Sequence, residues 1–309
     1  METALPVSER SVSSIVQSTP GGWTARGVSL LNPKKNRGNF FCLKIVDIYE
    51  QVFLLLKKDP TLGILFFAIA VLDLVALGIL FLAPVEPVSY VLAPIIRTFY
   101  DDAYLHYPQN FLLLPKLFTR SHFFIVATLG ILVNGLVIKK IERRLSSGRK
   151  LSSLSALSTV VKKYIPLLLS WLLTYFIFAI MSRFILQAAP KIIWLQWGIT
   201  FTLALLIQSL AAFFFPVFLL TEKKFFKGIL EGLRYAARNL AVTSAVISFP
   251  IFLVILHAFL KIFTPYYIRF YPELTLWVLA GGSILMAFVD LFVTSATTLL
   301  YLEGRNQRL

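Results

Sequence analysis

Long apolar stretches separated by short charged segments dominate the sequence. Residues 192–221 contain no Asp, Glu, Lys or Arg, and residues 121–138, 164–182 and 239–260 are equally free of them. A helix of about 20 apolar residues is long enough to cross a hydrocarbon core roughly 30 Å thick. The pattern therefore predicts an all-α polytopic membrane protein. We expect six transmembrane helices over residues 61–84, 121–139, 164–188, 193–220, 240–262 and 276–302.

Three further segments, each just before a predicted span, combine apolar positions with basic residues at their end. They cover residues 48–58, 154–163 and 229–238. Helices of this kind lie in the membrane interface, with the apolar face in the acyl boundary and the basic residues on headgroups. We therefore expect interfacial amphipathic helices before spans one, three and five. The simplest interpretation is three copies of one unit, so that the six helices form three hairpins.

The segments outside the spans differ in character. Residues 1–40 are rich in Ser, Gly and Asn and predict a disordered cytoplasmic tail ahead of a membrane domain over residues 41–305. Residues 85–120 hold several prolines and tyrosines and predict an outer interfacial loop with a short helix near 88–104. A lid over the helices is one interpretation of this loop, and an interfacial loop without a ligand is the other.

The charge distribution predicts an orientation. Hydrophobic residues make up 58% of the chain and charged residues 15%, and the net charge is +15. Of the 30 Lys and Arg residues, 23 flank one side of the predicted spans, which predicts a cell membrane location, by expectation the bacterial cytoplasmic membrane, with both termini in the cytoplasm. We expect membrane lipids as partners and no nucleic acid, with a protein partner left unknown. The expected contacts with anionic headgroups are Lys57, Lys58, Lys139, Lys140, Arg143, Arg144, Lys162, Lys163, Lys223, Lys224, Arg234 and Arg238.

Two carboxylates fall near the middle of predicted spans, where ionisable groups are costly and mark functional sites by default. They are Asp73 in span one and Asp290 in span six. Helical spacing places Thr294, Thr297, Thr298 and Tyr301 on one face with Asp290. This face predicts either a packing seam or a wet cavity or substrate path. No basic residue at the same depth offers either carboxylate a partner, since Arg183 and Lys261 lie near the outer ends of their spans.

The sequence contains no motif of a common catalytic or metal centre. We find no Walker A loop, no HExxH and no GxSxG, and the cytoplasmic segments are too short for a folded catalytic domain. The histidines His106, His122 and His257 belong to no metal-ligand spacing. We expect no cofactor, no metal and no enzymatic activity.

Two motifs carry a resemblance to a known group of proteins. One is the segment 221–239, which includes Leu233, Arg234, Tyr235, Ala236 and Ala237, and the other is the ending 297–305 with Tyr301, Glu303, Gly304 and Arg305. Together they resemble the six-span membrane domain found ahead of some bacterial glycerophosphodiester phosphodiesterases, and related stand-alone membrane proteins of unassigned function. The resemblance implies the architecture. It does not imply phosphodiesterase activity, because this chain has no segment for the phosphodiesterase barrel.

Two functional readings follow from the sequence. The first is a non-enzymatic scaffold, regulator or assembly subunit whose interfacial helices hold the cytoplasmic leaflet. The second is a transporter or permease-like subunit that moves a lipid or small solute along the polar face of span six.

Overall fold

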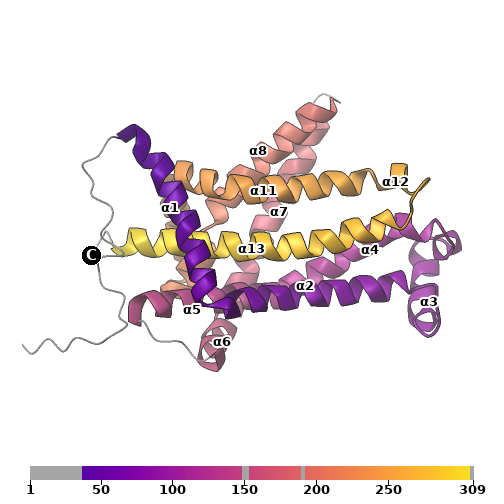
Figure 1. Ribbon diagram of the computed structural model, residues 1–309, viewed down its shortest axis with the longest axis horizontal. Coiled ribbons are helices and arrows are strands. Elements are labelled where there is room, and N and C mark those ends of the chain that lie inside the picture. The colour runs from indigo at the N-terminus through magenta and orange to yellow at the C-terminus, as the bar shows by residue number, and fades with distance from the viewer. Residues whose placement is uncertain (1–36, 148–152, 189–191, 307–309) are drawn as a thin grey trace, which may run out of the picture. The chain divides into compact units, whose positions relative to one another are not determined.

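The structure is a computed structural model that describes residues 37–147, 153–188 and 192–306. These residues are helical with short connections, and no strand occurs among them (Figure 1). Six helical segments of this part are long and apolar enough to cross a membrane: Pro60–Phe81, Asn110–Ser146, Tyr164–Ile185, Leu195–Leu220, Leu240–Ile262 and Leu274–Arg305. The predicted fold class is confirmed, and the chain is an integral membrane protein.

A helix precedes each odd-numbered span, as predicted. These are α1 (Arg37–Lys58), α6 (Ser153–Lys162) and α10 (Phe225–Arg238), which lead into α2 (Pro60–Phe81), α7 (Tyr164–Ala188) and α11 (Leu240–Ile262). One residue separates the two helices of each pair. At the first junction the cause is local: a proline at position 60 disfavours helical geometry for the residue before it, and Asp59 has φ −137° and ψ 79°. The chain can therefore turn sharply from the interface into the membrane.

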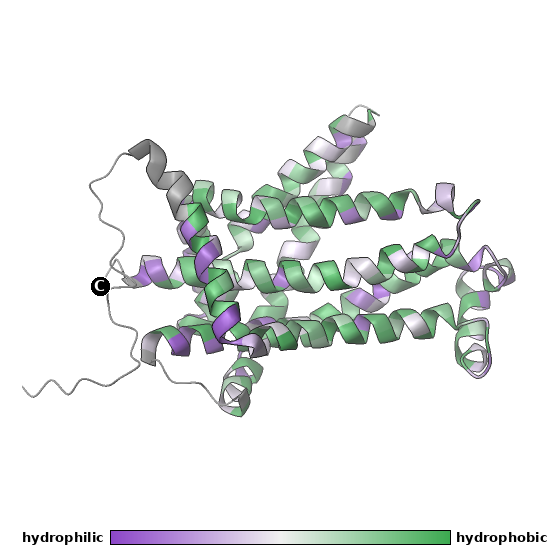
Figure 2. Ribbon diagram, in the orientation of Figure 1, coloured by the Kyte–Doolittle hydropathy of each residue, from purple (hydrophilic) through white to green (hydrophobic). Residues whose placement is uncertain are grey.

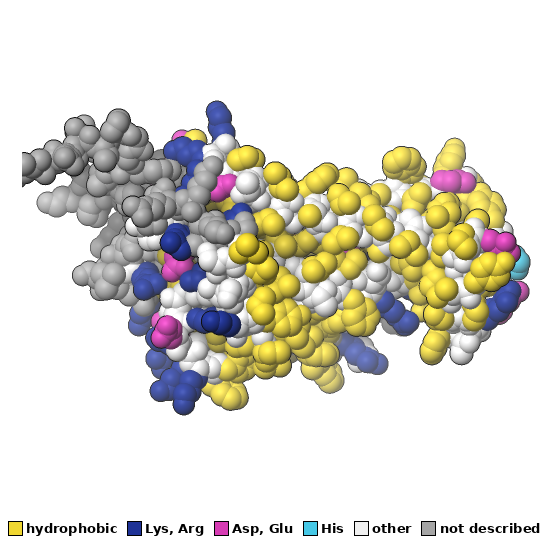
Figure 3. Space-filling model, turned by 90° about the horizontal axis from the view of Figure 1, so that it is seen from below, with side chains coloured by type: hydrophobic (Ala, Val, Ile, Leu, Met, Phe, Trp, Pro, Cys, Tyr) yellow, Lys and Arg dark blue, Asp and Glu magenta, His cyan; other side chains and the backbone are white. Residues whose placement is uncertain are grey.

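The basic side chains gather at one end of the spans. In Figure 1, α1 crosses α11 and α13 (Leu274–Asn306) at the end where α6 also lies. Figure 3 shows Lys and Arg side chains at this end and hydrophobic side chains along the middle. We name it the basic end, and the opposite end, where α3 (Ser89–Phe99) and α12 (Thr264–Tyr267) lie, the far end. The ribbon between them is predominantly hydrophobic (Figure 2), as expected for residues in hydrocarbon.

Helix α13 is the central element. It packs against α2, α5 (Ile131–Ser147) and α11. Small side chains allow these close approaches: Ser295, Ala296 and Thr298 of α13 are fully buried. The remaining hairpin is α7 with α8 (Ile193–Ala211), and α8 packs against α11 and α10. The polar face of α13 thus lies among several helices, so that side chains from more than one helix can meet on it.

The second span is longer than the predicted residues 121–139. It consists of α4 (Asn110–Ile125), a π-helical turn η3 (Val126–Gly130) and α5. The prediction began at residue 121 because Lys116 and Arg120 interrupt the apolar window. The helix tolerates Arg120 because its long side chain reaches over the ring of Tyr100, with 5.8 Å from Cζ to the ring centroid.

The predicted outer loop is consequently shorter and more structured than residues 85–120. It holds α3 and the 3-10 turn η2 (Asp102–Leu105), and α4 begins within its last part.

A tail was predicted over residues 1–40. Residues 1–36 lie outside the described residues, and helix α1 begins at Arg37. Span four is interrupted between α8 and α9 (Phe214–Leu220), near Pro216, which lacks the N–H for the carbonyl of Ala212 four residues earlier.

Tyrosine hydroxyls tie the helices of the basic end to the spans. The Tyr49 hydroxyl of α1 donates a hydrogen bond to the carbonyl oxygen of Val246 in α11 at 3.0 Å. In an uninterrupted helix this oxygen would accept the N–H of residue 250, but that residue is Pro250 and has none. Burial raises the pKa of Tyr49, so the hydroxyl stays protonated as a donor. The proline in span five therefore creates the acceptor that holds α1.

Candidate functional site

A carboxylate and an imidazole meet inside the membrane-spanning part. The Oδ2 atom of Asp73 in α2 lies 2.9 Å from Nδ1 of His122 in α4. Asp73 belongs to the stripe of α2 that faces the other helices, together with Phe66, Ile69 and Leu77. Only 1% of the Asp73 residue is exposed. The helical period of α2 thus directs an ionisable group into the protein interior.

The Asp73 carboxylate is only half satisfied. Its Oδ2 atom contacts His122, whereas the buried Oδ1 atom has no hydrogen-bond partner. The His122 side chain is 30% exposed, against 2% for Asp73. The ring also stacks on Phe118, with 6.1 Å between centroids. The pair therefore has a buried side with a free acceptor and a more open side at the imidazole.

Two other ionisable residues lie near this pair. Asp290 of α13 is within electrostatic range of both Asp73 and His122. His257 of α11 is within electrostatic range of His122. No hydrogen bond joins Asp290 or His257 to another residue in the described ranges. Asp73 and His122 are thus the contacting pair, and Asp290 and His257 lie at longer range from it on two further helices. In the described residues they do not form a group of three or more ligands that would hold a metal ion.

The rest of the predicted polar face is packed rather than open. The Thr294 hydroxyl donates to Oδ1 of Asn134 in α5. The hydroxyls of Thr297 and Thr298 donate to carbonyl oxygens of α13 itself, that of Thr298 to Thr294 at 2.6 Å. Tyr301 is buried with 4% exposure. The residues of this face toward the basic end thus form a packing seam, and Asp290 lies at its other end.

The sequence does not indicate the contact between His122 and Asp73, and the expectation that Asp73 has no partner at its depth was wrong. With span two starting at residue 121, His122 stood at a membrane boundary. The helix actually begins at Asn110, so His122 lies about three turns along it. One sequence pattern indicates the earlier helix start: apolar residues continue at helical spacing through residues 111–118. Phe111, Leu114 and Phe118 of this segment are buried.

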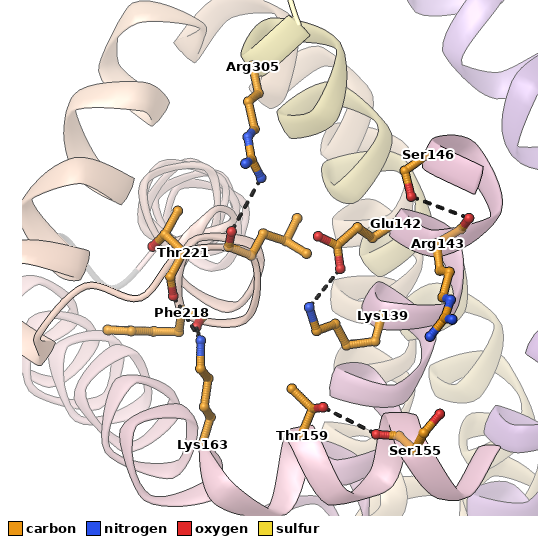
Figure 4. Close-up of polar contacts among 11 residues, drawn as sticks. Lys139, Glu142, Arg143, Ser146, Ser155, Thr159, Lys163, Phe218, Thr221 and Arg305 are labelled. Carbon is orange, nitrogen blue, oxygen red and sulfur yellow. Dashed lines mark hydrogen bonds and ion pairs between the residues drawn. The ribbon is translucent and has the colours of Figure 1, made fainter. Parts of the chain in front are cut away.

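Several residues expected to contact lipid headgroups also have protein partners (Figure 4). Lys163 Nζ donates to the carbonyl oxygens of Phe218 at 2.9 Å and Thr221 at 2.8 Å, at the end of α9. Burial lowers the pKa of Lys163, and the charge of Lys139 acts in the same direction. Lys163 thus satisfies carbonyls that a helix end leaves without partners. Other predicted contacts form ion pairs: Lys139 with Glu142, Arg144 with Asp59, and Lys223 with Glu231.

The two motifs behind the family resemblance contact each other. The Tyr235 hydroxyl of α10 donates to the carbonyl oxygen of Leu300 in α13 at 2.7 Å. Its ring packs on Tyr301, with 5.2 Å between centroids. A Cβ atom at Gly304 would lie 1.9 Å from the Tyr235 hydroxyl oxygen, so only glycine leaves it room. Arg305 donates to the carbonyl oxygen of Leu220 at 3.3 Å (Figure 4). These residues form a structural junction at the basic end.

Comparisons with protein-family models, with curated proteins and with solved structures gave no match, so the resemblance to the phosphodiesterase-associated membrane domain stays a prediction.

Proposed function

We propose that this integral membrane protein is a permease-like carrier that moves protons across a membrane. The observation that supports this most is the buried Asp73–His122 pair with its free carboxylate oxygen. The proposal includes a bacterial cytoplasmic membrane, with the basic end and both termini in the cytoplasm, because basic residues flank the cytoplasmic ends of spans.

A buried ionisable pair adds little to the stability of a protein, which argues that Asp73 and His122 serve a function. Removing one partner of a buried ion pair typically costs about 3–5 kcal/mol, whereas apolar replacements of both partners are often neutral or stabilising. A protein that only needs a packed membrane domain gains nothing from Asp73 and His122. An imidazole can take up and release a proton at one ring nitrogen while the other stays hydrogen-bonded to a carboxylate. The pair is therefore suited to binding and releasing a proton.

The chemistry uses the two ring nitrogens of His122 differently. With Nδ1–H donated to Asp73, the Nε2 atom is free to accept a proton. The imidazolium that forms remains paired with the Asp73 carboxylate. Asp290 is the next acceptor toward the basic end, because it lies within electrostatic range of both partners. Beyond it follow the hydroxyl of Thr294 and the amide of Asn134, which are joined by a hydrogen bond.

The test is proton flux into liposomes that contain the purified protein and the internal pH dye pyranine. After an external acid step, we expect faster internal acidification than in protein-free liposomes. Asp73→Asn and His122→Gln should return the rate to that of protein-free liposomes. Asp102→Asn is the matched control, because this carboxylate forms an exposed ion pair with Arg97 in the far-end loop. Wild-type liposomes no faster than empty ones would overturn the proposal.

A second candidate, a scaffold or assembly subunit, is favoured by one observation. Only 11% of the hydrophobic window of span three is buried within the chain. Exposed apolar side chains such as Phe176, Ile180 and Phe184 thus face either lipid or another membrane protein. Crosslinking through Ile180→Cys in native membranes distinguishes the two functions: a specific crosslinked protein, with no proton flux in liposomes, supports the scaffold.

A further inference from the structure

Span two contains a π-helical turn, η3 (Val126–Gly130), between α4 and α5. The backbone N–H of Ile131 donates to the carbonyl oxygen of Val126, five residues earlier. In a regular α-helix this N–H would donate to Ala127, four residues earlier. The π turn therefore takes the backbone donor away from the Ala127 carbonyl. Single π turns inside α-helices occur frequently at functional sites.

A tyrosine supplies the donor that the Ala127 carbonyl loses. The hydroxyl of Tyr164, the first residue of α7, donates a hydrogen bond to this oxygen at 2.8 Å. Ala127 is buried, and a buried carbonyl without a partner is costly. A regular α-helix would need no such donor, because its own backbone would supply one. The hydroxyl of Tyr164 therefore stabilises the π turn relative to the α-helix.

The π turn changes which residues of span two share a face. His122 in α4 and Asn134 in α5 are twelve residues apart. At about 100° per residue, a regular α-helix would place these two residues about 120° apart around its axis. A π turn accommodates one extra residue, which reduces this angle by about 100°, to about 20°. The two polar side chains therefore face nearly the same direction.

The contacts of the two side chains agree with this rotation. His122 meets Asp73 of α2 at 2.9 Å, and Asn134 accepts a hydrogen bond from Thr294 of α13. Helices α2 and α13 pack against each other, so both contacts lie on one side of span two. Without the π turn, a rotation of about 100° would direct His122 away from Asp73 while α5 kept its place against α13. The turn is therefore what allows the Asp73–His122 pair to form.

We propose that Tyr164 is a positioning residue for the Asp73–His122 pair. Its hydroxyl holds the π turn, and the turn holds α4 at the rotation that brings the imidazole to the carboxylate. Tyr164 thus acts through the backbone of span two and takes up no proton itself. Its role in transport rests on the proposed carrier function, whereas the rotation of α4 is a property of the fold that is measured separately.

Proton flux into liposomes tests the role in transport. Tyr164→Phe removes the hydroxyl alone, and we expect flux to fall at least about tenfold, in line with the contribution of a positioned proton-transfer group. Tyr49→Phe is the matched control, because it removes a comparable bond from a tyrosine hydroxyl to a carbonyl oxygen, 3.0 Å long, in a different span. Its flux should equal that of the wild type. Normal flux in Tyr164→Phe, with flux lost in Asp73→Asn, overturns the role of Tyr164 alone.

Deletion of the extra residue separates the turn from the hydroxyl. Leu129 lies within the turn and is 40% exposed, so its deletion removes little packing. The shortened span can form a regular α-helix that keeps His122 and Asn134 on one face, and the Ala127 carbonyl regains a backbone donor. We therefore expect deletion of Leu129 to restore flux in Tyr164→Phe. Flux that stays low after the deletion overturns the inference.

Thiol crosslinking measures the rotation of α4 without any transport. The chain has one cysteine, so Cys42→Ser provides a cysteine-free background. In it, we expect the short reagent 1,2-ethanediyl bismethanethiosulfonate to bridge Asp73→Cys and His122→Cys, as detected by mass spectrometry of the intact protein. Addition of Tyr164→Phe should slow the bridging, and bridging at an unchanged rate overturns the inference. Bridging that depends on Tyr164, in a protein without proton flux, keeps the positioning role and rejects the carrier function.

Discussion

Gly304→Ala tests the junction between α10 and α13 at the basic end. The added Cβ would lie 1.9 Å from the hydroxyl oxygen of Tyr235, 2.8 Å from its Cζ and 3.1 Å from its Cε2. Tyr235 is 6% exposed and packs on Phe213 and Tyr301, so the ring has no free space to enter. The substitution must therefore move the tyrosine and break its hydrogen bond to Leu300.

Three effects set the size of the change in the free energy of unfolding. Overpacking of this kind costs about 1–3 kcal/mol. Loss of the Tyr235 hydrogen bond adds about 1 kcal/mol. Replacing glycine by alanine within a helix recovers about 1 kcal/mol. We therefore expect Gly304→Ala to destabilise the protein by about 1–3 kcal/mol, and the control Gly281→Ala, which meets nothing within 4 Å, to be neutral or stabilising.

Unfolding by sodium dodecyl sulfate in mixed micelles, followed by tryptophan fluorescence, measures these differences. Tyr235→Phe combined with Gly304→Ala sharpens the test, because removal of the hydroxyl deletes the closest contact. The double variant should lose less stability than the sum of the two single variants. Equal stability of Gly304→Ala and Gly281→Ala, or strict additivity with Tyr235→Phe, would refute the reasoning.

Two further predictions concern the other helices of the basic end. Tyr49→Phe leaves the carbonyl oxygen of Val246 without a donor, so the free energy of unfolding should fall by about 1 kcal/mol in the same assay. The loss should be smaller in a Pro250→Ala background, because residue 250 then supplies an N–H to this oxygen. An equal loss in both backgrounds would contradict the assignment. Burial lowers the pKa of Lys163 from its ordinary 10.5, so the folded protein holds this proton less tightly than the unfolded chain, and the contribution of Lys163 to stability should rise with pH up to that value. Lys163→Met should therefore show a smaller increase of stability than the wild type as the pH rises toward 10.5, and identical pH profiles would reject the burial of the ammonium group.

The sequence by itself determined the class of the protein and the order of its elements. Length and hydrophobicity are local properties, and a chain in hydrocarbon must satisfy its backbone within helices. The apolar stretches therefore predict the spanning helices, and the basic amphipathic segments predict α1, α6 and α10. The one large error in extent, the start of span two, arose where Lys116 and Arg120 interrupt an otherwise helical apolar pattern.

Only the tertiary structure decided which polar groups meet. Asp73 and His122 lie in different spans, as do His257 and Gly282, and nothing near either residue in the sequence specifies the other. The room for His257 and Tyr235 depends on missing side chains at Gly282 and Gly304 of α13. Such contacts depend on how packed helices are rotated and displaced along one another, because a shift of about 1.5 Å per residue changes which side chains face each other. The sequence pattern fixes the apolar faces, and packing between them selects the pairs.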